Sequence, residues 1–151
     1  KMMPAGLGTS ATRQDAIVVG ALVVVNAVGD VRDARGDIIA GAREPDGKFL
    51  DSLRYLAGGG APFGDPNRLT RNTTLAIIAT NAVLDRVQLQ ALAQAGSDAL
   101  ARRITPYGTL YDGDVVFAVS TALVPAASPL QVEALAALAV PEAIERAVRR
   151  G

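Results

Sequence analysis

The feature that most constrains the fold is the run AIVVGALVVVNAV at residues 16 to 28. The run is almost continuously apolar and rich in β-branched residues, a pattern typical of a strand covered on both faces. Asn26 lies inside this run, where a buried amide is costly unless it is hydrogen-bonded. We therefore expect a sheet covered on both faces, with one buried amide in its central strand.

The composition is consistent with such a sheet packed against helices. The 151 residues are half apolar but only 4% aromatic, so the core has to be built from Ala, Val, Ile and Leu. Fifteen basic residues balance fifteen acidic ones, so the charge favours neither a nucleic acid nor a membrane surface as partner. The N-terminus lacks a signal-peptide pattern and no apolar run reaches membrane-spanning length, so we expect a cytoplasmic protein.

The remaining patterns predict an α+β layer fold. Glycines at the start, GLGTS at residues 6 to 10, indicate a tight turn, and Asn81 is a possible helix cap or turn. The other predicted elements, in chain order, are a hairpin around residues 38 and 39, a long flexible loop at 47–72, a strand at 73–80, a helix at 87–104, a strand at 115–121, and two helices at 129–139 and 141–150.

The chain has no cysteine and no histidine, which narrows its possible chemistry. Thiol nucleophiles, the commonest zinc ligands and the usual general base are all missing, and a hydroxyl activated by an amine or a carboxylate remains. One such arrangement is an N-terminal nucleophile, whose free α-amine, with a pKa of about 7.7 to 8.0, is the base. Thr73 is a natural candidate, because Asn72-Thr73 lies between the long loop and a strand. The alternative is that Thr73 only begins a strand, as β-branched residues often do.

Two further groups are candidates for the site. Asp112 and Asp114 flank Gly113 before a predicted strand, where they could orient an ammonium or a hydroxyl, or simply form a solvated turn. Asn26 could bind a developing oxyanion, or be satisfied by the backbone. The further oxygen ligands of a calcium loop are missing after Asp112, and GLGTS lacks phosphate-loop spacing. We therefore expect no cofactor.

Five segments taken together resemble the DmpA-like family of L-aminopeptidase/D-amidase/esterases. They are AGLGTSA at 5 to 11, VGALVVVNAVGDV at 19 to 31, IIAGARE at 38 to 44, NTTLAIIATNA at 72 to 82 and YDGDVVFAVST at 111 to 121. The Asn-Thr junction resembles the cleavage junction of the branch that contains the nylon-oligomer (aminohexanoate-oligomer) endohydrolases. The resemblance implies a four-layer α-β-β-α sandwich of the N-terminal-nucleophile-hydrolase type, of which this chain covers only part.

The resemblance also implies roles for individual residues. The precursor would cleave itself between Asn72 and Thr73, giving an α part that ends at residue 72 and a β part at 73–151. Thr73 would then be the nucleophile and its own amine the base, with Asn26 stabilising the oxyanion and Asp112 and Asp114 orienting the nucleophile. Lys1 matches a catalytic lysine that the nylon-hydrolase branch carries ahead of its glycine-rich turn.

The same resemblance implies how the chain is assembled and what it acts on. We expect 1–151 to be a single domain or the C-terminal part of a longer precursor, because family members carry a long upstream segment. The expected partners are a small peptide or amide substrate, that upstream segment, and further copies of the chain in a homo-oligomer. Two alternatives stay open: an acyltransferase of the ornithine acetyltransferase kind, which shares the fold and a threonine nucleophile, and an unprocessed, non-catalytic scaffold or binding fragment.

Overall fold

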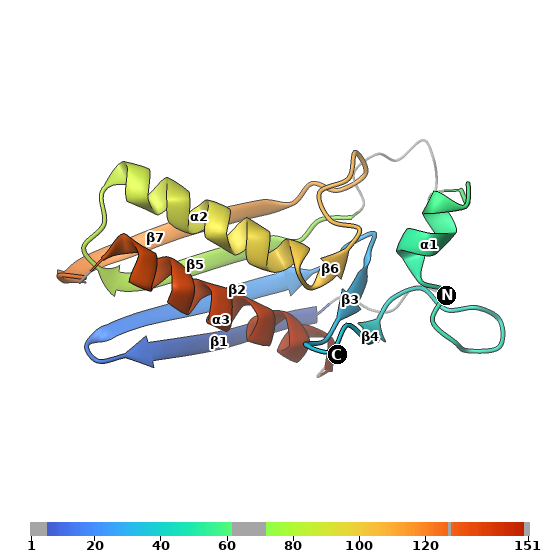
Figure 1. Cartoon of the computed structure of the whole chain (residues 1–151), viewed down its shortest axis with the longest axis horizontal. Helices are drawn as coiled ribbons and strands as arrows, with labels where there is room; N and C mark the ends of the chain where they lie inside the picture. The colour runs from blue at the N-terminus through green and yellow to red at the C-terminus, as the bar shows by residue number, and fades with distance from the viewer. Residues whose placement is uncertain (1–5, 62–71, 127, 150–151) are drawn as a thin grey trace.

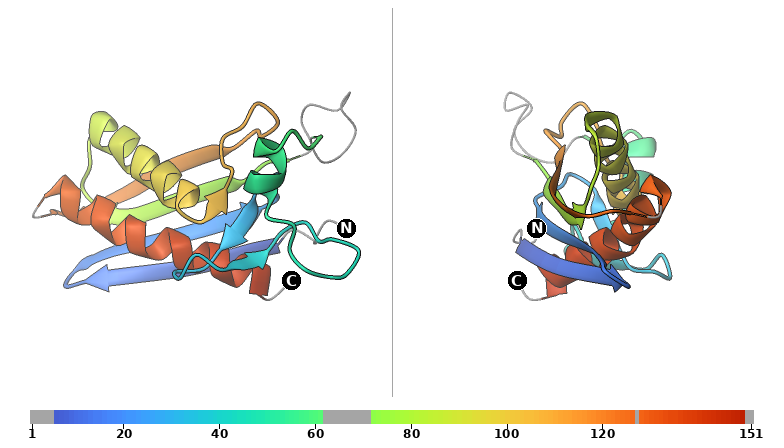
Figure 2. Two further views of the ribbon diagram at one scale, coloured as in Figure 1. Left: turned by 45° about the vertical axis from the view of Figure 1, so that its right-hand side comes forward. Right: turned by 90° about the vertical axis from the view of Figure 1, so that its left-hand side faces the viewer.

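A four-stranded sheet forms the centre of the computed structural model, which describes residues 6–61, 72–126 and 128–149. Its strands are β1 (Gly6–Gln14), β2 (Ile17–Val25), β5 (Leu75–Ala82) and β7 (Val115–Val124), in the order β1-β2-β5-β7. The pairs β1–β2 and β2–β5 are antiparallel, whereas β5 and β7 are parallel. Helices α2 (Arg86–Ala101) and α3 (Pro129–Arg149) lie on the same face of this sheet (Figures 1 and 2). The predicted α+β class is confirmed.

A second, smaller sheet sits at one end of the first. It contains β3 (Asp30–Arg32), β4 (Ile38–Ala40) and β6 (Ile104–Thr105) in the order β4-β3-β6, all antiparallel. The hairpin predicted around residues 38 and 39 is therefore confirmed as β3–β4. It pairs with β6 and not with the main sheet, so the small sheet links the end of α2 to the segment that follows β2.

Strand β2 is covered on one face only in the described chain. Alternate side chains from Ile17 to Val25 are buried under the helices, while the side chains between them are partly or fully exposed. The expectation of a strand covered on both faces is therefore wrong for these residues. Asn26 lies beyond the end of β2 and its side chain is exposed, so the expected buried amide is wrong as well.

The other face of the main sheet is open and apolar. The strand registers place large side chains from four neighbouring strands on this face. They are Leu22, Val115, Leu75, Ile77, Val119, Phe117 and Leu7, with exposed fractions from 36% for Leu22 to 58% for Leu7. Contiguous apolar surface of this kind is unusual on a monomeric domain and is typical of an interaction surface. The β-branched run of β2 is thus apolar on both faces although the described chain covers only one.

The N-terminal glycines begin a strand where a turn was predicted. A Cβ placed on Gly6 would lie 1.9 Å from the carbonyl oxygen of Ala147, and one on Gly8 would lie 2.0 Å from that of Ala143. The absence of side chains at these two positions lets the backbone of α3 pack directly on β1. The glycines therefore serve helix–sheet packing, which their turn propensity alone did not indicate.

Two helix predictions need correction. The segments 129–139 and 141–150 form one helix, α3, with Pro141 in its interior. Proline removes one helical hydrogen bond at a cost of about 3 kcal/mol, and burial of Val140, Ala143 and Ile144 against the sheet offsets it.

Helix α2 begins after a capping box formed by Asp85 and Gln88, and it ends at Ala101 rather than at Ile104, which belongs to β6. Asn81 lies in β5 and caps no helix. Its side chain accepts from Val18 N at 2.9 Å and donates to the Ala16 carbonyl at 2.9 Å, so it ties β5 to the start of β2.

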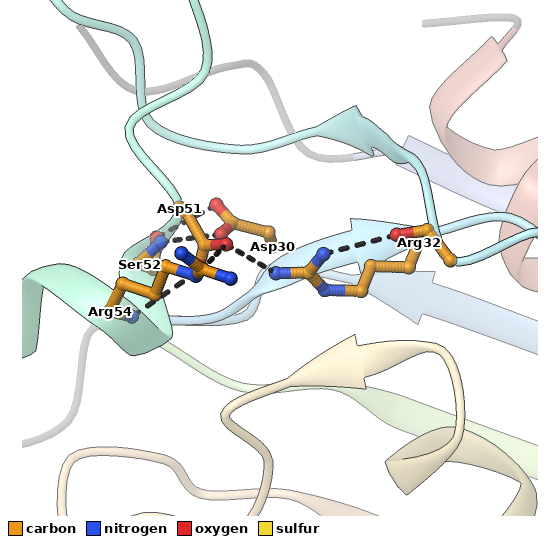
Figure 3. Close-up of polar contacts among 6 residues, drawn as sticks. Asp30, Arg32, Asp51, Ser52 and Arg54 are labelled. Carbon is orange, nitrogen blue, oxygen red and sulfur yellow. Dashed lines mark hydrogen bonds and ion pairs between the residues drawn. The ribbon is translucent and has the colours of Figure 1, made fainter. Parts of the chain in front are cut away.

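Part of the predicted loop at 47–72 is ordered by a buried aspartate. Helix α1 (Ser52–Ala57) lies within that range, and residues 62–71 of the loop lie outside the described residues. Asp30 is completely buried and accepts from the N–H of Ser52 at 2.6 Å and from its hydroxyl at 2.7 Å (Figure 3). Burial raises the pKa of Asp30, against the lowering effect of these hydrogen bonds. The start of α1 is thus held on β3.

Within the described residues no helix combines the length and the apolarity that crossing a bilayer would need.

The contact between α3 and β1 predicts a sharp difference between two glycines of neighbouring strands. Gly8→Ala should lower the free energy of unfolding by about 1 to 3 kcal/mol or more, because its Cβ would collide with helix backbone that cannot move aside. Gly20→Ala should change it by no more than about 0.5 kcal/mol or raise it slightly, since the nearest atom to its Cβ is 3.8 Å away. Denaturant unfolding of both variants measures this. Equal losses would contradict the proposed packing.

Candidate active site

Thr73 lies where the end of β2, the start of β5 and the segment before β7 meet. Its main-chain N–H donates to the carbonyl oxygen of Asn26 at 2.7 Å. The preceding residue, Asn72, forms an isolated parallel bridge with Asp112, so the pairing of β5 with β7 extends beyond both strands. The peptide bond between Asn72 and Thr73 is therefore held from two sides.

The carbonyl oxygen of Asn72 receives two hydrogen bonds. The hydroxyl of Thr73 donates to it at 2.7 Å, and the main-chain N–H of Gly113 donates to it at 3.0 Å. The hydroxyl oxygen thus lies beside the carbonyl group of its own preceding residue, which is the group attacked in an N-to-O acyl shift. Gly113 has no side chain on this side, and a Cβ there would lie 2.9 Å from the Thr73 hydroxyl oxygen.

The carboxylate of Asp112 is bound by main-chain and side-chain donors on both of its oxygens. Oδ1 accepts from Val28 N at 3.2 Å, and Oδ2 accepts from Thr109 N at 3.1 Å and from the Thr109 hydroxyl at 2.7 Å. Asp112 therefore connects the turn before β7 to the segment that follows β2.

The carboxylate of Asp114 accepts hydrogen bonds from two main-chain N–H groups. Its Oδ1 accepts from Thr74 N at 2.6 Å and its Oδ2 from Gly108 N at 3.3 Å. Burial raises the pKa of Asp114, and the nearby charge of Asp112 raises it further, while the hydrogen bonds from Thr74 and Gly108 oppose both effects. A carboxyl group that holds its proton to higher pH than usual is therefore hydrogen-bonded to the N–H of Thr74, the residue that follows Thr73.

The structure brings most of the predicted residues together. Thr73, Asn72, Asp112 and Asp114 lie in one hydrogen-bonded cluster, in agreement with the common site that the family resemblance implies. Asn26 joins the cluster through its main-chain carbonyl, and the oxyanion role predicted for its amide remains a prediction. Lys1 lies outside the described residues.

Sequence reasoning missed two members of the cluster. In the sequence Gly113 only separates two aspartates, and it is the parallel pairing of the segment before β7 with the segment before β5 that directs its N–H at Asn72. Thr109 was not singled out, although a hydroxyl three residues before an aspartate is a recurrent local hydrogen-bonding pattern. Among the described parts of the chain, no group of three or more acidic side chains is arranged to hold a metal ion.

The motifs and their geometry agree with a comparison against protein families. The model of peptidase family S58 matches residues 2–151. The chain belongs to peptidase family S58. An uncharacterised aminopeptidase of Mycobacterium bovis is 39% identical over 128 residues, which are 79% of this chain and 36% of that protein. A 6-aminohexanoate-oligomer endohydrolase of a Kocuria species is 30% identical over 124 residues, covering 77% of this chain and 33% of the relative.

A solved structure supports the fold. The L-aminopeptidase D-Ala-esterase/amidase of Ochrobactrum anthropi, described as a variant of the Ntn hydrolase fold, superposes with a TM-score of 0.55 at 22% identity. The match covers 95% of this chain and 40% of that one. This S58 chain thus has the Ntn-hydrolase type of α+β fold, and it matches about a third of the length of these two relatives.

The raised pKa of Asp114 predicts a pH dependence of stability. At a pH above the ordinary value of 3.8, the unfolded chain has lost a proton that the folded state still holds. The stabilising contribution of Asp114 to the folded state is therefore complete below pH 3.8, and it is lost as the pH rises through the raised pKa of the folded state. In an uncut Thr73→Ala background, Asp114→Asn should become more stable relative to its parent as pH rises through this window.

Asp33 provides a control of opposite sign. The N–H of Arg35 holds the pKa of Asp33 below its usual value, so its contribution to stability is lost as pH falls. The stability of Asp33→Asn relative to its parent should therefore increase as pH falls. Thermal unfolding from pH 3 upward checks both, and a pH-independent difference for Asp114→Asn would contradict the buried carboxyl.

Proposed function

We propose that this chain carries the self-cleavage junction and the nucleophile of an amidohydrolase. The observation that supports the proposal best is the position of the Thr73 hydroxyl, 2.7 Å from the carbonyl oxygen of Asn72. A hydroxyl in this position needs only a small movement to reach the carbonyl carbon. Membership in a peptidase family and the absence of cysteine and histidine both favour a threonine in this role.

The proposed cleavage has two steps. In the first, the Thr73 oxygen bonds to the Asn72 carbon, the carbon–nitrogen bond breaks, and the proton of the hydroxyl is transferred to the departing nitrogen. The product is an ester between Asn72 and the side chain of Thr73. In the second step one water molecule hydrolyses that ester, leaving a carboxylate on Asn72 and restoring the hydroxyl of Thr73 beside a free α-amine.

The free amine then acts as the general base toward substrates. An α-amine has a pKa of about 7.7 to 8.0, so a useful fraction is unprotonated at neutral pH. The carbonyl of Asn26, which accepts from Thr73 N at 2.7 Å, would hold that nitrogen in place after cleavage. Asp112 and Asp114 would position the backbone around that nitrogen through the N–H groups of Val28 and Thr74. The amide of Asn26 and the amine of Lys1 remain proposed members of the site.

The proposed substrates are small peptides, amino-acid amides or ω-amino-acid oligomers. This range rests on the aminopeptidase and 6-aminohexanoate-oligomer endohydrolase relatives. Because relatives of this chain are more than twice as long, substrate-binding residues outside the present sequence would select among these amides.

The open face of the main sheet is the proposed contact with the rest of the protein. Its exposed apolar side chains are suited to packing against a second sheet, about 10 Å away, in a layered sandwich. We propose that an upstream segment of the same protein provides that sheet and that the assembled protein is a homo-oligomer.

Intact-mass analysis of the full-length protein tests the cleavage. The wild-type protein should yield one species that ends at Asn72 and one that begins at Thr73. Thr73→Val should remain a single uncut chain without amidase activity, because the substitution retains the shape of the side chain and removes the attacking oxygen.

Thr74→Val is the matched control for this substitution. It removes the neighbouring hydroxyl but retains the main-chain N–H that Thr74 donates to Asp114 at 2.6 Å, so cleavage should still occur. The nucleophile assignment would be refuted by cleavage of Thr73→Val at the Asn72–Thr73 bond.

The open face can be tested with the chain 1–151 alone. It should self-associate, because the apolar face lacks its cover, and the double variant Ile77→Lys with Phe117→Lys should be markedly less associated. Leu130→Lys is the control, since Leu130 is 71% exposed but belongs to α3 on the opposite side of the sheet. Sedimentation velocity measures the association of the unmodified chain, the double variant and Leu130→Lys. If the double variant and Leu130→Lys reduce association equally, the open face is not the contact surface.

A further inference from the structure

We propose that the main-chain N–H of Gly113 binds the oxyanion formed when Thr73 attacks the carbonyl of Asn72. This inference rests on the self-cleavage proposed above and adds a catalytic group that no side-chain motif contains. The observation behind it is the hydrogen bond of 3.0 Å from Gly113 N to the Asn72 carbonyl oxygen, the oxygen on which negative charge would develop.

The need for this donor follows from the chemistry of the attack. Before the reaction the Asn72 oxygen accepts from both the Thr73 hydroxyl and Gly113 N. Once the Thr73 oxygen is bonded to the Asn72 carbon, its proton has left and it can no longer donate. Of these two donors, Gly113 N still donates after the attack. At that stage the carbonyl electron pair has moved onto the oxygen, and a hydrogen-bond donor stabilises the oxygen most.

Glycine is required at this position for space as well as for the donor. A Cβ on residue 113 would come 2.9 Å from the Thr73 hydroxyl oxygen and 3.9 Å from the Asn72 carbonyl oxygen. A side chain would therefore press on the hydroxyl as it turns from the carbonyl oxygen toward the carbonyl carbon. A glycine between two aspartates provides the N–H and leaves that path open.

The flanking carboxylates hold the donor in place. Asp112 is bound by Val28 N and by two donors of Thr109, and Asp114 is bound by Thr74 N at 2.6 Å. Both neighbours of Gly113 are thus tied to surrounding backbone, so the direction of its N–H is set before the reaction begins. Preorganisation of this kind is what makes an oxyanion donor effective, because no reorientation is needed during charge development.

The test removes a single N–H. Replacing Gly113 by glycolic acid converts its amide to an ester, which deletes the donor without adding an atom beyond the oxygen. The matched control replaces Val115 by 2-hydroxy-3-methylbutanoic acid, which deletes the next bond of the same ladder, from Val115 N to the Thr74 carbonyl at 3.0 Å. Both esters are introduced into the full-length protein by cell-free translation, and cleavage is followed over time by mass.

The ester at 113 should slow cleavage by about 10²- to 10³-fold, the usual effect of losing one oxyanion donor. The control ester should leave the rate close to that of the unmodified protein, since the Thr74 carbonyl does not react. Equal rates for the two esters would overturn the inference while leaving the self-cleavage itself intact. An unmodified protein that stays uncut would instead overturn the proposed function, and this inference with it.

A spectroscopic measurement guards against an ester that fails to fold. In the uncut Thr73→Ala protein, a scalar coupling across the hydrogen bond between Gly113 ¹⁵N and Asn72 ¹³C′ reports the donor directly. Detection of the coupling supports the assignment. Its absence in the folded protein would overturn the assignment whatever the ester variants do.

Discussion

The candidate site depends on the parallel pairing of β5 with β7. Parallel neighbours begin at the same end of a sheet, and the chain must cross over from the end of one strand to the start of the next. Helix α2 is that crossover, and it packs on the buried face of the sheet. As a result, Asn72 and Thr73 before β5 come beside Asp112 and Gly113 before β7, although the two segments are 40 residues apart between Asn72 and Asp112.

The same pairing gives the reactive peptide bond its surroundings. The side chains of Ala76 and Ile78 in β5 are buried under the helices, and this burial anchors the chain just after Thr73. Two backbone segments then hold the junction itself, the end of β2 through the Asn26 carbonyl and the segment before β7 through Gly113 N. A threonine in this position presents a hydroxyl to its own preceding carbonyl without any histidine or cysteine nearby.

The two faces of the main sheet differ in how they are covered. One face is completed by α2 and α3, whose small residues and the glycines of β1 allow close packing. The other face carries large apolar side chains from β1, β2, β5 and β7 that remain exposed. The relatives that this chain matches are more than twice as long, and the proposed cover for the open face is a sheet from a segment upstream.

Local sequence patterns determined much of the architecture and of the site. The β-branched run predicted β2 and the threonine junction predicted a strand behind it, because side-chain type and short spacing are local properties. The family resemblance carried by NTTL and DGD implied that these two motifs share a site. Tertiary structure decided the rest. Packing on α3 turned GLGTS into a strand, burial carried α3 through Pro141, and strand pairing gave Gly113 an N–H directed at Asn72. These outcomes depend on which distant segment lies opposite each residue, and no single stretch of sequence contains that information.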